Sequence, residues 1–237
     1  MSVVVACYTT GSVYGVERLL LKFKELIGKE AFEKAVRIYD ELFKITVEPL
    51  LLASPRKFED KMLELHPTFT TYLGQITTIT TLPVLERSEK DPQLLERFRE
   101  FEREAFRVLE HLLRQKASGI LGKKVEFLMD VTATLFDYDL WVLGKIKEYG
   151  LGGFMRKLEN YKDVVTEMVS HLLQAHHAYF ITLYGVLSSR ENYKLENLNK
   201  AVSLAWKHCQ ELDDYVDTVN ILITPNLYEE VKPHIEK

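Results

Sequence analysis

The sequence predicts an all-α protein, a single-domain bundle of roughly seven or eight helices, and three observations support this prediction. Apolar residues recur three and four positions apart through almost the whole chain, which is the spacing of one face of an α-helix. Glycines and prolines stand between these periodic segments at the positions that helix ends prefer. With 46% hydrophobic and 28% charged residues, the composition is that of a globular protein that folds throughout.

The first two helices follow an apolar N-terminus. Residues 1–7, MSVVVAC, are too short and lack the basic start of a signal peptide, and they leave room for a short strand. Ser12 is the candidate N-cap of a helix that ends at Gly28. The next helix follows directly, and Pro49 is expected to bend or end it because proline lacks a backbone N–H.

Residues 68–83, TFTTYLGQITTITTLP, carry conflicting signals. Threonine and isoleucine are β-branched and favour strands. The apolar positions, however, are spaced three and four apart rather than two: Phe69, Tyr72, Leu73, Ile76 and Ile79. The spacing therefore predicts a helix in this segment.

The remaining chain is predicted to form four long helices. They cover about 92–118, 123–149, 154–188 and 195–223, separated by the short sequences GILG, GLGG and SSRENYK. Ser54, Asp91 and Thr224 each precede a proline, an arrangement typical of a helix start. No linker-like tract or repeat appears, so residues 1–237 are predicted to be one domain, with 86–92 as the weakest point.

Net charge and cysteine usage limit the classes of function. The formal net charge is −4 and no segment is a basic arm, so nucleic acid is not an expected partner. Cys7 and Cys209 are far apart in sequence and belong to no CxxC pair, which indicates neither a disulfide framework nor a structural zinc site. We expect a reducing, cytoplasmic location, and the abundance of Lys and Glu suits a thermophile.

Two uncharged runs, Leu65–Leu85 and Leu172–Ser189, approach the length of a membrane span. The first contains seven threonines, two prolines and a glutamine, and the second has a glutamine and two histidines at its centre. Such polar groups are costly in hydrocarbon. Both runs are therefore predicted to belong to a soluble fold that does not enter a membrane.

The stretch CQELDDYVD, residues 209–217, places Asp213, Asp214 and Asp217 in a DDxxD pattern. The apolar residues of the same helix form one continuous stripe: Leu198, Val202, Ala205, Cys209, Leu212, Val216, Val219 and Ile223. All three aspartates lie off this stripe. A solvated helix face is therefore the favoured interpretation, with no metal and no cofactor.

Within this stretch, QELDDYVD resembles the second aspartate-rich motif of the trans-prenyl diphosphate synthases. The resemblance implies that Asp213, Asp214 and Asp217 bind Mg²⁺, which in that family holds a substrate diphosphate. The match covers eight residues, and no DDxxD pattern occurs in the first two-thirds of the chain. The sequence TVNILITPNLYEEV stands where the family has a segment with lysine and glycine. The magnesium site is therefore kept as the alternative.

Two polar residues stand on otherwise apolar stripes. His176 occupies a core-facing position in LLQAHHAYFITLYGVL, a segment that is apolar nearly all round, and Asp139 occupies one in the helix over 123–149. Glu102 is a weaker third case. Buried polar groups need partners, so Asp139 and His176 are each expected near a polar group and are candidates to meet each other. A satisfied structural contact between central helices is favoured.

If these positions instead line a ligand pocket, the candidate ligand-binding residues are Asp139, His176, His177 and Tyr179. The familiar catalytic and nucleotide-binding motifs are absent, so the favoured hypothesis is a non-enzymatic helical protein that binds a protein partner, a second copy of itself or a small apolar ligand. The alternative is a magnesium-dependent helical enzyme that acts on a diphosphate or isoprenoid-like substrate through the three aspartates.

Overall fold

The computed structural model describes residues 4, 7–8, 11 and 15–235, and every regular element in that part of the chain is helical. Eight of its α-helices have 11 residues or more, which confirms the all-α bundle. The strand considered for residues 1–7 falls mainly outside the described residues, and Val4 and Cys7, which are described, are helical. Ser12 also lies outside them, but the helix for which it was the candidate N-cap begins at Glu17, with Val16 as its N-cap.

The first half of the chain ends its helices where the sequence predicts. Helix α2 (Glu17–Ile27) stops at Gly28, whose φ of 92° suits glycine and whose amide donates to the Lys24 carbonyl at 2.9 Å. Helix α3 (Lys29–Leu42) passes through a π-helical turn (Phe43–Val47) into α4 (Glu48–Leu52). In that turn the Glu48 amide donates to the Phe43 carbonyl, immediately before Pro49, so the bend expected at this proline is a π-turn.

The threonine-rich segment is helical, as its spacing predicts. Helix α5 (Phe58–Thr80) buries Phe69, Leu73 and Ile76. Its threonine hydroxyls donate to carbonyls three or four residues earlier in the same helix, for example Thr77 to Leu73 at 3.0 Å and Thr80 to Ile76 at 2.8 Å. These bonds satisfy the hydroxyls without breaking the helix, which is why β-branched residues are tolerated here.

The second half differs from the sequence prediction at one break. The single helix expected over 154–188 is two helices, α9 (Leu151–Glu159) and α10 (Lys162–Ser188), because Tyr161 leaves helical conformation with φ −124° and ψ 39°. The prediction of one helix there was wrong because the apolar spacing continues across the turn. Helices α7 (Pro92–Leu121), α8 (Val125–Tyr149) and α11 (Leu195–Ile223) lie close to their predicted ranges. Helix α12 (Pro225–Ile235) starts after Thr224, as predicted, and α6 (Leu82–Ser88) is a further short helix that the sequence did not predict.

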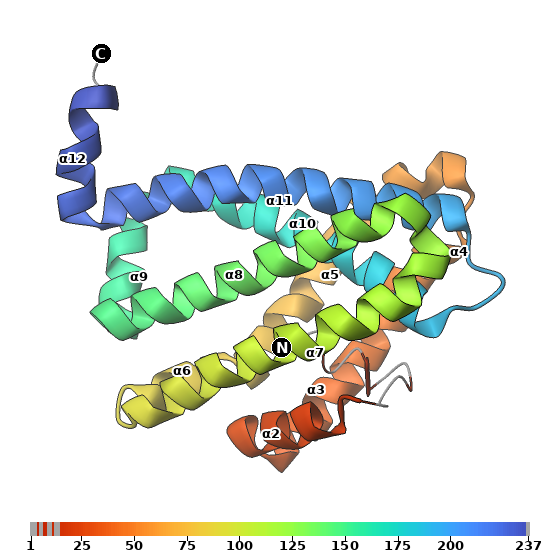
Figure 1. The fold of residues 1–237 in the computed structure, drawn as a ribbon, viewed down its shortest axis with the longest axis horizontal. Coiled ribbons are helices and arrows are strands. Elements are labelled where there is room, and N and C mark those ends of the chain that lie inside the picture. Colours follow the sequence, from red (N-terminus) through yellow and green to blue (C-terminus); the bar gives the residue numbers. More distant parts are fainter. Residues whose placement is uncertain (1–3, 5–6, 9–10, 12–14, 236–237) are drawn as a thin grey trace.

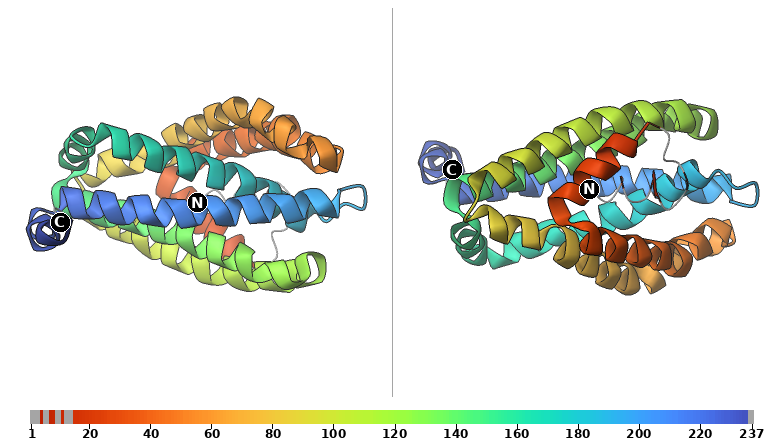
Figure 2. Two further views of the ribbon diagram at one scale, coloured as in Figure 1. Left: turned by 90° about the horizontal axis from the view of Figure 1, so that it is seen from above. Right: turned by 90° about the horizontal axis from the view of Figure 1, so that it is seen from below.

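The long helices form the body of the molecule (Figure 1). Helix α11 packs against α10 along one side and α8 along the other, and α8 packs on α7 (Figure 2). Helix α5 pairs with α3 and touches α10, while α2 lies against α3 and α7. Among the described residues, no helix combines the length and the apolar character that crossing a membrane requires.

Candidate functional site

Two hollows flank helix α7. One is a groove of about 430 Å³ between α2, α6 and α7, which we call the charged groove. The other is a cavity of about 570 Å³ between α5, α6, α7, α8 and α10, which we call the acidic cavity. Both volumes are within the range of about 300–1,000 Å³ that small-molecule sites occupy. The chemistry of their walls distinguishes them.

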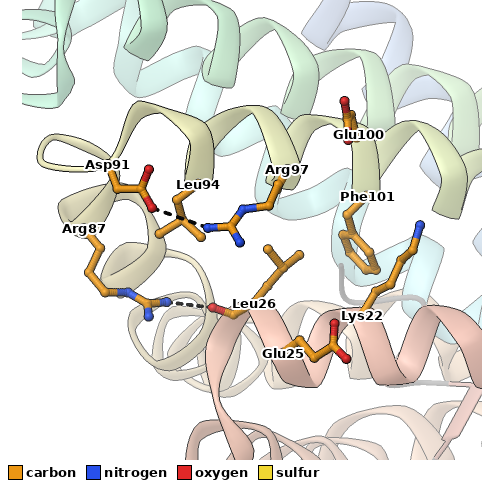
Figure 3. A pocket seen from close by; sticks show the side chains of 9 residues that line it. All are labelled: Lys22, Glu25, Leu26, Arg87, Asp91, Leu94, Arg97, Glu100 and Phe101. Atoms are coloured by element: carbon orange, nitrogen blue, oxygen red, sulfur yellow. Dashed lines mark hydrogen bonds and ion pairs between the residues drawn. The ribbon is translucent and has the colours of Figure 1, made fainter.

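The charged groove is a surface feature whose charges are matched (Figure 3). Its walls carry three basic and three acidic side chains around three apolar ones: Lys22, Arg87 and Arg97; Glu25, Asp91 and Glu100; Leu26, Leu94 and Phe101. Arg97 pairs with Asp91 at 3.4 Å, and Arg87 donates to the Leu26 carbonyl at 2.7 Å. Lys22 pairs with Glu104, just outside the groove. Such pairing is ordinary for a protein surface.

The acidic cavity has a mainly apolar wall. Seven of its described lining residues are apolar: Leu73, Leu85, Phe98, Val142, Leu143, Leu172 and Leu173. The others are small or polar: Thr70, Gly74, Thr77, Thr81, Glu102, Tyr138, Asp139 and His176. A wall of this kind, with a few placed polar groups in an apolar surface, is typical of ligand sites.

Helix α5 presents a small polar stripe to the acidic cavity. Thr70, Gly74, Thr77 and Thr81 are spaced four, three and four residues apart, so they share one face of the helical path into α6. Gly74 and Thr77 are exposed and form the solvent side of the cavity. This stripe is visible in the sequence as a helical spacing of small and polar residues. The apolar residues on which the helix prediction rests lie mostly on the other face of the same segment.

The floor of the acidic cavity is helix α7. Phe98 and Glu102, one helical turn apart, are 2% and 1% exposed. Asp139 on α8 and His176 on α10 stand in the walls and are half-buried, since part of their surface faces the hollow. The structure therefore brings the two predicted polar positions, and the weaker third one, to a single site.

Burial controls the protonation of the acids. Removal from water raises the pKa of Glu102 to about 7; the positive charge of the N-terminus opposes this rise, and the negative charge of Asp139 adds to it. Burial also raises the pKa of Asp139. Carboxyl groups with raised pKa values, set in a hollow with apolar walls, are characteristic of functional sites.

His176 is neutral near pH 7. Burial lowers its pKa to about 4, and the hydrogen bond to the Leu172 carbonyl opposes this only in part. Its Nδ1 lies 2.9 Å from that carbonyl oxygen, which can only accept, so the proton of the neutral ring is on Nδ1. The Nε2 atom of His176 consequently carries a free lone pair.

The other two candidate ligand-binding residues lie elsewhere in α10. His177 is fully buried, its Nδ1 is 3.2 Å from the Nδ1 of His66, and its ring stacks on Phe69 with 4.3 Å between centroids. The hydroxyl of Tyr179 is 3.1 Å from the Thr132 hydroxyl in the core. Neither is among the residues that line the acidic cavity. His177 follows His176 by one residue and so points about 100° away around the helix, whereas Tyr179 lies three residues on, about 4.5 Å further along the helix axis, where it meets Thr132.

The aspartate cluster is at the surface. Asp213, Asp214 and Asp217 are all exposed on α11. Partial burial raises the pKa of Asp213, and the charges of Asp217, Asp137 and Asp214 add to the effect. Within the described part of the chain, no three His, Cys, Asp or Glu side chains are grouped so as to hold a metal ion.

Comparisons with known proteins give no further guide to the site. No family model matches the chain, and neither a curated protein nor a solved structure matches it. The function is therefore argued from the geometry and chemistry of the two hollows.

Proposed function

We propose that this protein binds a small, mainly apolar molecule in the acidic cavity. The observation that carries the proposal is the cavity itself: about 570 Å³ of space with seven apolar lining residues and a few polar groups. Burying an apolar ligand there removes apolar surface of both partners from water, at roughly 25 cal/mol per Å². Of the kinds of binding that the sequence leaves open, a small ligand is the one for which the fold provides a shaped site.

The polar groups of the acidic cavity support this assignment. They come from three helices that are far apart in sequence: Glu102 on α7, Asp139 on α8 and His176 on α10. A few polar groups placed in an apolar wall are what orients a bound small molecule in a ligand site.

The proposal can be tested with hexanol, a neutral probe with an apolar body. Gly74 lines the cavity in the middle of α5, and an added Cβ at this position meets no atom within 4 Å. Gly74→Leu should therefore fill the mouth of the cavity and weaken hexanol binding at least about tenfold, whereas the wild type should bind it saturably in a calorimetric titration. A change of tenfold corresponds to about 1.4 kcal/mol.

The matched control is Gly119→Leu. Gly119 is an exposed glycine of α7 that lines neither hollow, and an added Cβ there also meets no atom within 4 Å. Its hexanol affinity should equal that of the wild type. Absence of saturable binding to the wild type, or equal weakening by the two substitutions, would contradict the proposed function.

A further inference from the structure

Two pairs of histidines join neighbouring helices away from the acidic cavity. His171 of α10 lies beside His208 of α11, with 3.2 Å between their Nδ1 atoms. His66 of α5 lies beside His177 of α10 at the same Nδ1–Nδ1 distance of 3.2 Å. This separation is at the upper end of an ordinary hydrogen bond, about 2.7–3.2 Å. It is also close to the roughly 3.3 Å between two nitrogens that each lie about 2.0–2.1 Å from one tetrahedral zinc ion. The distance alone therefore allows either a shared proton or a shared metal ion.

The buried pair fits the shared proton. His177 is fully buried, and its Nε2 has no hydrogen-bond partner in the described part of the chain. Metal binding through Nδ1 would place the single proton of the neutral ring on this Nε2, and a buried N–H without an acceptor is destabilising. If His177 instead donates its Nδ1–H to His66, its Nε2 carries only a lone pair. The His66–His177 pair is therefore a hydrogen bond.

The His171–His208 pair has different surroundings. Both rings are half-buried, and neither Nε2 is among the buried nitrogens that lack a partner. Each Nε2 can therefore carry a proton without the cost that applies to His177. The ring of His171 stacks on Tyr215, with 5.4 Å between the ring centroids, and this contact holds its orientation. Contacts that orient the imidazole ring are a usual part of a histidine metal site.

The charge around this pair favours a cation. Glu167 is four residues before His171 and Glu211 is three residues after His208, which are neighbouring positions on a helix face. Helices α10 and α11 pack together and are joined by the short connection 189–194, so they run antiparallel and both glutamates lie toward the same end of the pair. Both are exposed and form no ion pair within the described chain. Glu211 and Lys207 act on the His208 ring with opposite sign, and Glu167 adds a second negative charge.

We propose that His171 and His208 bind a divalent transition-metal ion such as Zn²⁺ through their Nδ1 atoms and so link α10 to α11. On binding, the proton shared between the two Nδ1 atoms moves through water to the Nε2 of the ring that carried it, so both Nδ1 lone pairs reach the metal. No third His, Cys, Asp or Glu of the described chain is grouped with the pair, so water fills the remaining positions.

Imidazole nitrogens select the class of ion. They suit zinc, copper and nickel, whereas magnesium and calcium prefer oxygen ligands. The pair therefore differs in both place and chemistry from the magnesium site that the aspartates of α11 would form. It is also independent of the proposed function, because neither histidine lines the acidic cavity.

The experiment titrates Zn²⁺ into the full-length chain, without an affinity tag and after removal of metals with a chelator. Calorimetry at about pH 7.5, where ordinary imidazole is mostly neutral, should show one saturable site in the wild type. His171→Ala and His208→Ala should each weaken Zn²⁺ affinity at least about tenfold, since each removes one of two protein ligands. Excess Mg²⁺ should not compete. The matched controls are His66→Ala, from the buried pair, and His111→Ala, an exposed histidine of α7, and both should leave Zn²⁺ affinity unchanged.

Three results would overturn the metal site. The first is no saturable Zn²⁺ binding to the wild type, and the second is binding that His171→Ala and His208→Ala leave unchanged. The third is binding that His66→Ala removes and His171→Ala does not, which would place the ion at the buried pair. If the alanine variants do not fold, the X-ray absorption spectrum of the Zn²⁺-loaded wild type decides the question. Scattering from two imidazole rings supports the site, and coordination by oxygen alone overturns it.

Discussion

The charged groove and the acidic cavity lie on two faces of one helix and differ in the sign and the burial of their charged side chains. Leu94, Arg97 and Phe101 of α7 face the groove, while Phe98 and Glu102 face the cavity, roughly a third of a turn away. The groove balances positive and negative side chains at the surface. The cavity gathers carboxyl groups among apolar side chains.

The difference shows why the larger number of charges does not identify the functional site. Exposed ion pairs contribute about 0–1 kcal/mol each, so the pairs of the groove add little to stability. A carboxyl group as buried as Glu102, at 1% exposure, reduces stability unless its surroundings compensate. Such a group is more informative about function than six charged side chains at the surface.

The largest expected effects come from the two phenylalanines of α7, one from each hollow. Phe98 and Phe101 are each 2% exposed, and Phe101 stacks on Phe23 with 5.6 Å between ring centroids. Replacing either by alanine should lower the free energy of unfolding by about 3–5 kcal/mol, measured with urea. Only Phe98→Ala should also change hexanol affinity. Equal effects of the two variants on binding would contradict the distinction between the hollows.

The next effect concerns pH and two glutamates of α7. Burial raises the pKa of Glu102 to about 7 from an ordinary value near 4.3, so the folded state holds this proton more tightly than the unfolded state. The stability contributed by the protonated carboxyl is present below about pH 4.5 and is lost as the pH rises to about 7. Glu102→Gln should therefore gain stability relative to the wild type across that interval, by several degrees in Tm.

Glu100→Gln is the matched control, since Glu100 is exposed on the neighbouring face of the same helix. Its Tm should follow the wild type at every pH. Burial lowers the pKa of His176 to about 4 and of His177 to about 3, and these groups increase stability as the pH rises. Because they act equally in all three proteins, the differences isolate Glu102. A pH-independent difference for Glu102→Gln would show that this carboxyl does not change its proton affinity on folding.

A smaller effect is expected at the end of the charged groove. Asp91 is the N-cap of α7, and its carboxylate accepts a hydrogen bond from the Gln93 amide at 3.1 Å. Asp91→Ala should lower the free energy of unfolding by about 1 kcal/mol, the usual value of an N-cap, and leave hexanol binding unchanged. Arg97→Ala removes only the exposed pair with Asp91 and should cost less than about 0.5 kcal/mol. A larger loss for Arg97→Ala would mean that the groove depends on its ion pairs.

Most of the fold could be predicted from the sequence because helices are specified locally. The apolar spacing and the glycine and proline positions closely predict the C-terminal end of α2 and both ends of α8 and α11. The break between α9 and α10 was missed because Tyr161 itself packs against the core and continues the apolar pattern through the turn. Periodicity cannot detect a change of direction that leaves the spacing intact.

The acidic cavity could be predicted only in part. Asp139 and His176 were recognised because each interrupts an apolar stripe, and that local signal correctly gave their direction toward the interior. Tertiary packing determines which helix faces meet. The convergence of Asp139 and His176 with Glu102 and the α5 stripe therefore could not be predicted from the sequence. His177 and Tyr179 were grouped with His176 by proximity in sequence, whereas the helix directs them to His66 and Thr132.

The smallest expected effect concerns the aspartates of α11. It tests whether they are solvated surface charges, like those of the charged groove, or part of a binding site, as we propose for the acidic cavity. Asp213, Asp214 and Asp217 are exposed, so their charges are solvated and the structure provides no enclosed wall around them. Titration with Mg²⁺ and pyrophosphate should show no tight binding, and Asp213→Ala should change the free energy of unfolding by less than about 0.5 kcal/mol. At neutral pH the substitution should raise the stability, because partial burial and the negative charges of Asp217, Asp137 and Asp214 raise the pKa of the Asp213 carboxyl and so disfavour its ionised form. Tight magnesium-dependent pyrophosphate binding that is lost in Asp213→Ala would support the diphosphate enzyme instead, and it would show that an exposed acidic face, and not only a buried one, can be the functional site of this protein.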